Sequence, residues 1–145
     1  MKKPLFLFAV MFLFSNPVLS QSYDLLTRAN SGDTFAQMML GDMFAAGEGV
    51  VQDYSEAATW YRLAAYRGVA KAQLSLGLLY SQGQGVEKNL ERAYQWVYTA
   101  AAKGEVGAAQ ARDQIAVQLD AETIESLQQL AIRCIESNYL QCGNG

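Results

Sequence analysis

The sequence predicts an all-α protein built as a short array of stacked helix pairs. The first observation is that the chain of 145 residues matches itself when it is shifted by 36 positions. The second is that apolar residues within each copy recur at spacings of three and four, the period of an amphipathic helix. A self-match of this period is typical of helical repeat proteins, and the length suits one short array.

The repeat is marked most clearly by its glycines and tryptophans. Twelve of the 36 positions are identical between residues 33–68 and 69–104, where average residue usage would give about two. The identical pairs are Ala36 and Ala72, Gln37 and Gln73, Leu40 and Leu76, Gly41 and Gly77, Gly47 and Gly83, Gly49 and Gly85, Val50 and Val86, Ala57 and Ala93, Trp60 and Trp96, Ala64 and Ala100, Ala65 and Ala101, and Gly68 and Gly104.

The first twenty residues have the pattern of an export signal. Lysines at positions 2 and 3 precede the apolar run Leu5–Phe14, which is shorter than the roughly 20 residues that span a membrane. Asn16 and Pro17 interrupt the helical pattern, and Ser20 supplies the small residue of a cleavage site. We expect residues 1–20 to be a cleaved signal peptide. The alternative is an uncleaved N-terminal anchor, which Asn16 and Pro17 disfavour.

The expected mature chain begins near Gln21 and lies in the periplasm or outside the cell. No cysteine follows the apolar run, so a lipoprotein anchor is excluded, and we expect no membrane span after cleavage. Without the two leading lysines the chain carries nine basic and 14 acidic residues, a net charge of −5. Because no basic block is present, we expect no nucleic-acid partner.

Helix start and stop signals place the elements of the array in order. Residues 21–32 predict an N-terminal capping helix over Tyr23–Ser31, ended by Gly32. In the first repeat, residues 33–68, the first helix covers Phe35–Ala45 and ends at a glycine-rich turn. Asp53 then caps a second helix that ends before Gly68.

The remaining elements repeat this plan and then close it. The second repeat, residues 69–104, has Asn89 as the cap of its second helix. Residues 105–145 predict a degenerate third repeat and C-terminal cap. Its first helix covers Ala108–Leu119, and Asp120 caps a final helix over Ala121–Ser137.

Glycines and tryptophans inside the helices predict close packing. Gly41 and Gly77 stand in mid-helix, where glycine costs about 1 kcal/mol relative to alanine, so we expect a neighbouring helix to approach closely there. Trp60 and Trp96 share the spacing of the alanine stripe. We expect both to be core residues that fill the space between paired helices.

The repeated residues closely resemble the Sel1-like repeat, a relative of the tetratricopeptide repeat. The shared pattern is A-x-x-x-L-G-x-x-F/Y-x-x-G-x-G-V-x-x-D/N-x-x-x-A-x-x-W-x-x-x-A-A-x-x-G, read from Ala36 and again from Ala72. The resemblance is strong over Gly32–Ala108 and weak in the flanks. It implies a short right-handed α/α solenoid that serves as an adaptor for other proteins. Secreted bacterial members are similar scaffolds in envelope assembly, regulation or host contact.

Cys134 and Cys142 are the only cysteines, and they stand eight residues apart. The same separation joins Ala64 to Ala72, across the expected contact between one repeat's second helix and the next first helix. Some secreted cysteine-rich members of the family are similar in bridging at this separation. In an exported chain the resemblance therefore implies an intramolecular disulfide. An intermolecular bridge and two free thiols stay open as alternatives.

The sequence offers few groups for catalysis. It contains no histidine, which removes serine–histidine and cysteine–histidine pairs and the usual zinc ligands. Acidic residues are spread singly, and neither a phosphate-binding loop nor a serine-nucleophile motif is present. We therefore expect no enzyme activity, no cofactor and no metal site.

The resemblance also indicates where a partner would bind. In tetratricopeptide-like arrays the first helices line the concave side, which places a groove at Met38, Asp42 and Ala45, at their counterparts Leu74, Leu78 and Ser81, and at Gln110 and Gln114. An apolar strip of Met38, Leu74 and Leu78 would suit a peptide or helix. The alternative is that these residues pack inside the superhelix.

The sequence as a whole predicts an exported adaptor for a protein or peptide partner. Two other functions stay open. One is a cell-wall-ligand or β-lactam-binding protein with weak hydrolase activity. The other is a dedicated immunity or inhibitor protein.

Overall fold

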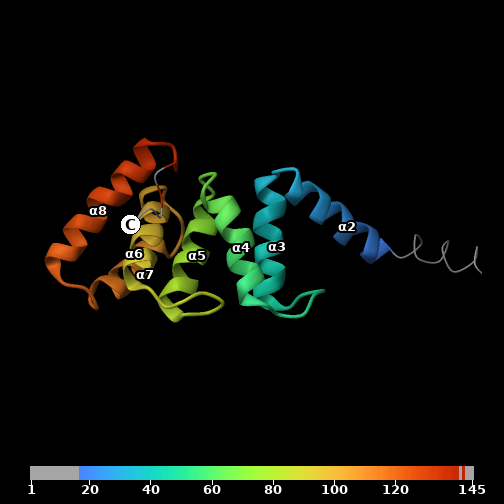
Figure 1. Cartoon of the computed structure of the whole chain (residues 1–145), viewed down its shortest axis with the longest axis horizontal. Helices are drawn as coiled ribbons and strands as arrows, with labels where there is room; N and C mark the ends of the chain where they lie inside the picture. The colour runs from blue at the N-terminus through green and yellow to red at the C-terminus, as the bar shows by residue number, and fades with distance from the viewer. Residues whose placement is uncertain (1–16, 141, 143–145) are drawn as a thin grey trace, which may run out of the picture.

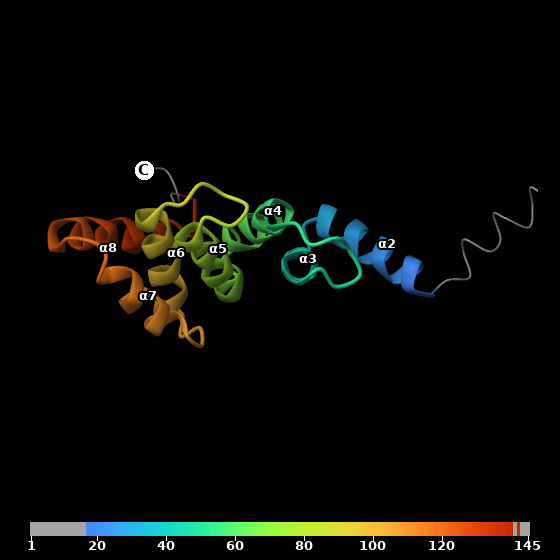
Figure 2. The same ribbon diagram turned by 90° about the horizontal axis from the view of Figure 1, so that it is seen from below.

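The chain folds as an all-α repeat solenoid. The computed structural model describes residues 17–140 and 142, and within these residues it contains seven α-helices and no strand (Figure 1). In chain order the helices are α2 (Pro17–Asn30), α3 (Thr34–Ala46), α4 (Tyr54–Ala65), α5 (Ala70–Gln82), α6 (Leu90–Ala102), α7 (Ala108–Ala116) and α8 (Ala121–Glu136). Figure 2 shows the same helices following one another along the long axis, from α2 at one end to α8 at the other. The predicted fold class is confirmed.

Side chains cap the second helices as the sequence predicts. The Asp53 carboxylate accepts hydrogen bonds from the backbone amides of Ser55 and Glu56 at 2.8 and 3.1 Å. Asn89 caps α6 and Asp120 caps α8 in the same manner. These oxygens satisfy amides that have no partner within the helix, and so they fix where each helix begins.

The two helical hairpins turn by the same backbone geometry. Gly47 and Gly83 follow α3 and α5 with φ of 73° and 70°, in the left-handed region that glycine adopts without a steric penalty. Their amides donate to the carbonyls of Met43 and Leu79 and close the last turn of each helix. The glycines that mark the repeat in the sequence are therefore the residues that reverse the chain.

Close approach of helices at Gly41 and Gly77 is confirmed. A Cβ atom on Gly41 would overlap the ring of Tyr61, and one on Gly77 would lie 2.5 Å from Cγ2 of Val97. The residues that fill these spaces are thus Tyr61 and Val97, one position after the tryptophans.

The two tryptophans differ in burial. Trp96 is 3% exposed and belongs to the main core, with its ring 5.3 Å edge-on from the ring of Tyr66. Trp60 is half-buried and packs against a smaller cluster beside α2. The position of Tyr66 is occupied by Asn30 one repeat earlier, so Trp60 has no corresponding aromatic neighbour from α2. The core prediction holds for Trp96 and overstates the burial of Trp60.

Successive units are joined by contacts that recur with the repeat. Gln37 donates to the carbonyl of Ala29 at 3.0 Å, and its counterpart Gln73 donates to that of Ala65 at 3.1 Å. Each of these two hydrogen bonds joins a second helix to the first helix that follows it. These repeated bonds hold neighbouring units in one register, since a buried polar group that lost its partner would be costly.

The ends of the array differ in detail from the expected boundaries. The capping helix begins at Pro17, earlier than expected, because proline suits the first position of a helix. The first sixteen residues of the expected signal peptide lie outside the described residues. At the other end α7 stops at Ala116, and α8 packs against α6. The last helix therefore covers the apolar face of the second repeat.

Replacing Gly77 by alanine tests the close approach of α5 and α6. The new methyl group would meet Val97 and lie 3.1 Å from the carbonyl oxygen of Ala93, so the helices must separate. Overpacking of this kind costs about 1–3 kcal/mol, which exceeds the gain in helix propensity. We expect urea unfolding to show that loss. Alanine at the exposed Gln82 of the same helix is the control and should leave stability unchanged.

Candidate functional site

The eight predicted groove residues lie on three successive first helices, α3, α5 and α7. Met38 is 5% exposed and belongs to the main core, and Leu74 is half-buried against the same core. Leu78 is 36% exposed, and Gln110 and Gln114 are exposed. We call the members of the predicted set Asp42, Leu78, Gln110 and Gln114, which are at least partly open to solvent, the first-helix face. It is narrower and more polar than an apolar strip through Met38 and Leu74 would be.

Asp42 ties three helices together at the edge of this face. Its Oδ1 accepts a hydrogen bond from the Tyr61 hydroxyl at 2.8 Å, and its Oδ2 lies 2.8 Å from Nζ of Lys71. Burial of the phenol, together with the bond to Asp42, raises the pKa of Tyr61 well above its ordinary value. The Asp42 carboxylate thus has one partner on α4 and one on α5. The side chains of Asp42 and Lys71, which form the ion pair, are both partly open to solvent.

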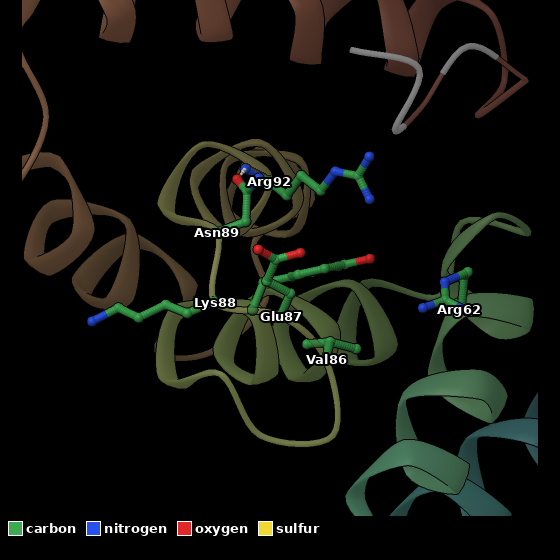
Figure 3. Close-up of a pocket in the computed structure, with 7 residues that line it drawn as sticks. Arg62, Val86, Glu87, Lys88, Asn89 and Arg92 are labelled. Carbon is green, nitrogen blue, oxygen red and sulfur yellow. Dashed lines mark hydrogen bonds between the residues drawn. The ribbon is translucent and has the colours of Figure 1, made fainter.

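A polar cleft lies outside the predicted groove, where α4 meets the segment joining α5 to α6 (Figure 3). It has a volume of about 410 Å³ and is lined by Arg62, Tyr80, Val86, Glu87, Lys88, Asn89 and Arg92. We call it the arginine cleft. None of the predicted groove residues lines it.

Aromatic and capping contacts order one wall of the arginine cleft. Tyr80, at the end of α5, is buried, and the guanidinium carbon of Arg92 stands 5.8 Å from the centre of its ring. That distance is within the range of a cation–π contact. Asn89 accepts a hydrogen bond from the amide of Arg92 at 2.8 Å and so fixes the start of α6. Arg92 is therefore positioned by its backbone amide on Asn89 and by its guanidinium on the Tyr80 ring.

A second cleft of about 550 Å³ lies between α6 and α8 and is acidic. It is lined by Glu91, Asp120, Glu122, Thr123, Ser126, Leu127 and Leu130. The amide and hydroxyl of Thr123 hydrogen-bond the Asp120 carboxylate and lower its pKa. That carboxylate is therefore engaged in capping α8. Within the described residues, no three acidic or cysteine side chains are grouped so that they could hold a metal ion.

The two cysteines meet at the C-terminal end of the array. The structure pairs Cys134 of α8 with Cys142, with their Cα atoms 4.8 Å apart, and both are buried. The pair stands where the other junctions have two alanines, such as Ala64 and Ala72, that are equally buried. The loop between the cysteines seats Tyr139 in the core.

Tyr139 links this tail to the repeats. The ammonium group of Lys103 lies 4.7 Å from the centre of the Tyr139 ring and donates a hydrogen bond to the carbonyl of Gly68. Arg67 donates similarly to Gly32 one repeat earlier. A basic side chain therefore bonds a glycine carbonyl at two junctions of the array, and Tyr139 of the tail covers the second of these contacts.

None of the helices among residues 17–140 is both long enough and apolar enough to cross a membrane.

Comparison with known proteins identifies the repeats. The Sel1 repeat profile matches residues 34–69 and 70–105. A solved Sel1 repeat protein from Oxalobacter formigenes is 30% identical with a TM-score of 0.51, and the match covers 74% of this chain and 96% of that one. Among curated proteins, none matches the chain.

A second solved structure matches over more of the sequence. It is a protective antigen present in uropathogenic Escherichia coli strains and displays an SLR fold; it is 28% identical with a TM-score of 0.74. The match covers 90% of this chain, but this chain spans only 30% of the antigen. With the profile match and the Oxalobacter relative, the conclusion is that the chain belongs to the Sel1 repeat family.

Proposed function

We propose that the protein is an exported, non-catalytic adaptor that binds a protein partner on its first-helix face. The observation that carries this proposal is the position of Leu78. It is a large apolar side chain, 36% exposed, on the middle one of three successive first helices. Exposed Gln110 and Gln114 lie on the next first helix, and half-exposed Asp42 lies on the preceding one. An apolar centre with a polar rim is typical of a protein interface.

Two features of the sequence support export. Lysines at positions 2 and 3 followed by the apolar run Leu5–Phe14 have the pattern of a secretory signal. The paired cysteines suit an oxidising compartment, where a disulfide persists. We propose a periplasmic or secreted location, tested by fractionation and by the mass of the mature chain. Cleavage after Ser20 is the expected result, and a chain retained at full length in the cytoplasm would contradict it.

The test of the binding face compares two matched leucine variants. The mature protein is immobilised and used to capture proteins from a cell-envelope extract, which are identified and quantified by mass spectrometry. Leu78→Asp should reduce recovery of the specific partner by about tenfold or more, because truncating a central interface contact costs at least about 1–2 kcal/mol. Leu63→Asp makes the same chemical change at an exposed leucine of α4, away from the face.

The control decides between surface binding and general damage. Leu63→Asp should retain the partner, and both variants should keep the helical circular dichroism of the parent protein. Equal loss in both variants, or full capture by Leu78→Asp, would contradict the proposed face. Turnover of nitrocefin by the purified protein would contradict a non-catalytic role.

A further inference from the structure

The arginine cleft carries a local positive charge on an acidic protein. Its lining contains three basic side chains and one carboxylate, whereas the whole chain has a net charge of −3. We propose that the arginine cleft binds a carboxylate-bearing, acidic peptide segment of a protein. This inference goes beyond the proposed function, because none of the residues of the first-helix face lines the cleft.

The basic groups of the cleft have no carboxylate partner within the part of the chain that the structure describes. Arg62, Lys88 and Arg92 form no ion pair within 4.0 Å there. Elsewhere Arg28, Lys71 and Arg112 are each paired with an aspartate. The cleft therefore holds guanidinium groups whose hydrogen-bond donors are available to a ligand.

The arrangement suits a carboxylate. A guanidinium presents parallel donors that bind the two oxygens of a carboxylate, and Arg92 is oriented by the ring of Tyr80. In Figure 3 the Arg92 guanidinium extends toward the side on which Arg62 lies, whereas Lys88 points the other way. The two arginines, from α6 and α4, thus border the same space. Its volume of about 410 Å³ is within the range of ligand-binding clefts, about 300–1,000 Å³.

The internal repeat shows that the fold does not require these cations. The positions of Arg62, Lys88 and Arg92 are occupied one repeat earlier by Leu26, Gln52 and Glu56. The first repeat closes its own hairpin, from α3 to α4, with Gln52 and Glu56 at the positions of Lys88 and Arg92. The glycines that reverse the chain, Gly47 and Gly83, are identical in both copies, whereas these cations are not, so the hairpin folds without them.

The positions of the charges in the cleft favour a carboxylate over a phosphate. Glu87 lines the same space, and Figure 3 shows its carboxylate below the Arg92 side chain. Arg62 and Arg92 come from different helices, so two carboxylates spaced along a chain can each meet one arginine, whereas a phosphate concentrates its charge at one point. The ligand that fits best carries single charges spaced along a chain, as a glutamate- or aspartate-rich segment does.

Heteronuclear NMR titration of the purified protein tests the inference. The probe is acetyl-Gly-Glu-Glu-Gly-amide, and the comparators are acetyl-Gly-Gln-Gln-Gly-amide and inorganic phosphate. We expect the glutamate peptide to shift the amide signals of residues 86–92 and the side-chain signals of Arg62 and Arg92, and its affinity to fall as salt rises. Equal shifts from the glutamine peptide, equally tight binding of phosphate, or no binding at all would each overturn the inference.

Charge variants at the cleft sharpen the test. Arg62→Gln and Arg92→Gln should each weaken binding of the glutamate peptide by about tenfold, the usual effect of losing a charged hydrogen bond. Glu87→Gln should strengthen it by roughly threefold, because a like charge is removed. The pair Arg112→Gln and Arg133→Gln removes two cations that do not line the cleft and should have little effect. Weakening by that pair equal to that of the cleft variants would show a general charge effect and overturn the site. If Arg62→Gln still captures the envelope partner, binding at the first-helix face does not depend on the arginine cleft, and the two proposals are tested separately.

Discussion

Replacing Trp96 by alanine is expected to lower the free energy of unfolding by about 3–5 kcal/mol. The side chain is almost fully buried in the main core, against Tyr66. Its removal loses both the transfer free energy of a large side chain and the packing around the cavity. Because small domains have a total stability of about 5–15 kcal/mol, this one change removes a large part of it.

The matched change at the equivalent position of the first repeat should cost less. Trp60 is only partly buried, so Trp60→Ala is expected to cost only about 1–2 kcal/mol. Urea unfolding followed by circular dichroism measures both variants, and Trp96→Phe provides an intermediate case should Trp96→Ala fail to fold. Equal losses at the two tryptophans would contradict the difference in burial.

Removing the cysteine pair is expected to lower the free energy of unfolding by about 2–3 kcal/mol. A cross-link that closes a loop of eight residues restricts the unfolded chain by about this amount in the entropic model. The variant Cys134→Ala with Cys142→Ala replaces the pair by the two alanines found at the other junctions, so little packing strain is introduced. Urea unfolding without reductant measures the loss.

Reductant provides the control for the cysteine variant. Addition of reductant should bring the parent protein down to the stability of the double alanine variant and leave the variant itself unchanged. Two free thiols in protein isolated from the periplasm, or equal stability of parent and variant, would contradict an intramolecular bridge.

The regular part of the fold could be predicted because its signals are local. Asp53, Asn89 and Asp120 begin helices through hydrogen bonds to amides two or three residues ahead, so the residue type and its position are sufficient. Gly47 and Gly83 end helices because of their own backbone conformation. Because these signals recur at an interval of 36 residues, we expect neighbouring units to stack in the same way.

The differences arise where a residue's environment comes from another unit. Trp60 and Trp96 have the same spacing in their helices, but only Trp96 has an aromatic residue from the preceding unit beside it. Met38 appears as a surface residue in the helical pattern, yet it is buried in the main core. Burial of this kind depends on which elements lie before and after a repeat, which the repeat pattern does not contain.

The arginine cleft could not be recognised from a motif. Arg62 lies in one repeat and Arg92 in the next, and only the stacking of α4 beside the α5–α6 hairpin brings them to one space. The sequence signal that could have indicated the cleft is the set of positions at which the two repeats differ. In a repeat protein the shared residues specify the fold, and the residues that depart from the repeat are candidates for binding.

Side-chain oxidation footprinting of the protein, alone and in complex with its captured partner, tests the central claim most directly. The account predicts that Leu78 on the first-helix face becomes protected in the complex, while Leu63 on α4, which is 45% exposed, reacts equally in both states. Protection of Leu63 with Leu78 still fully reactive would contradict the assignment of the first-helix face as the partner surface.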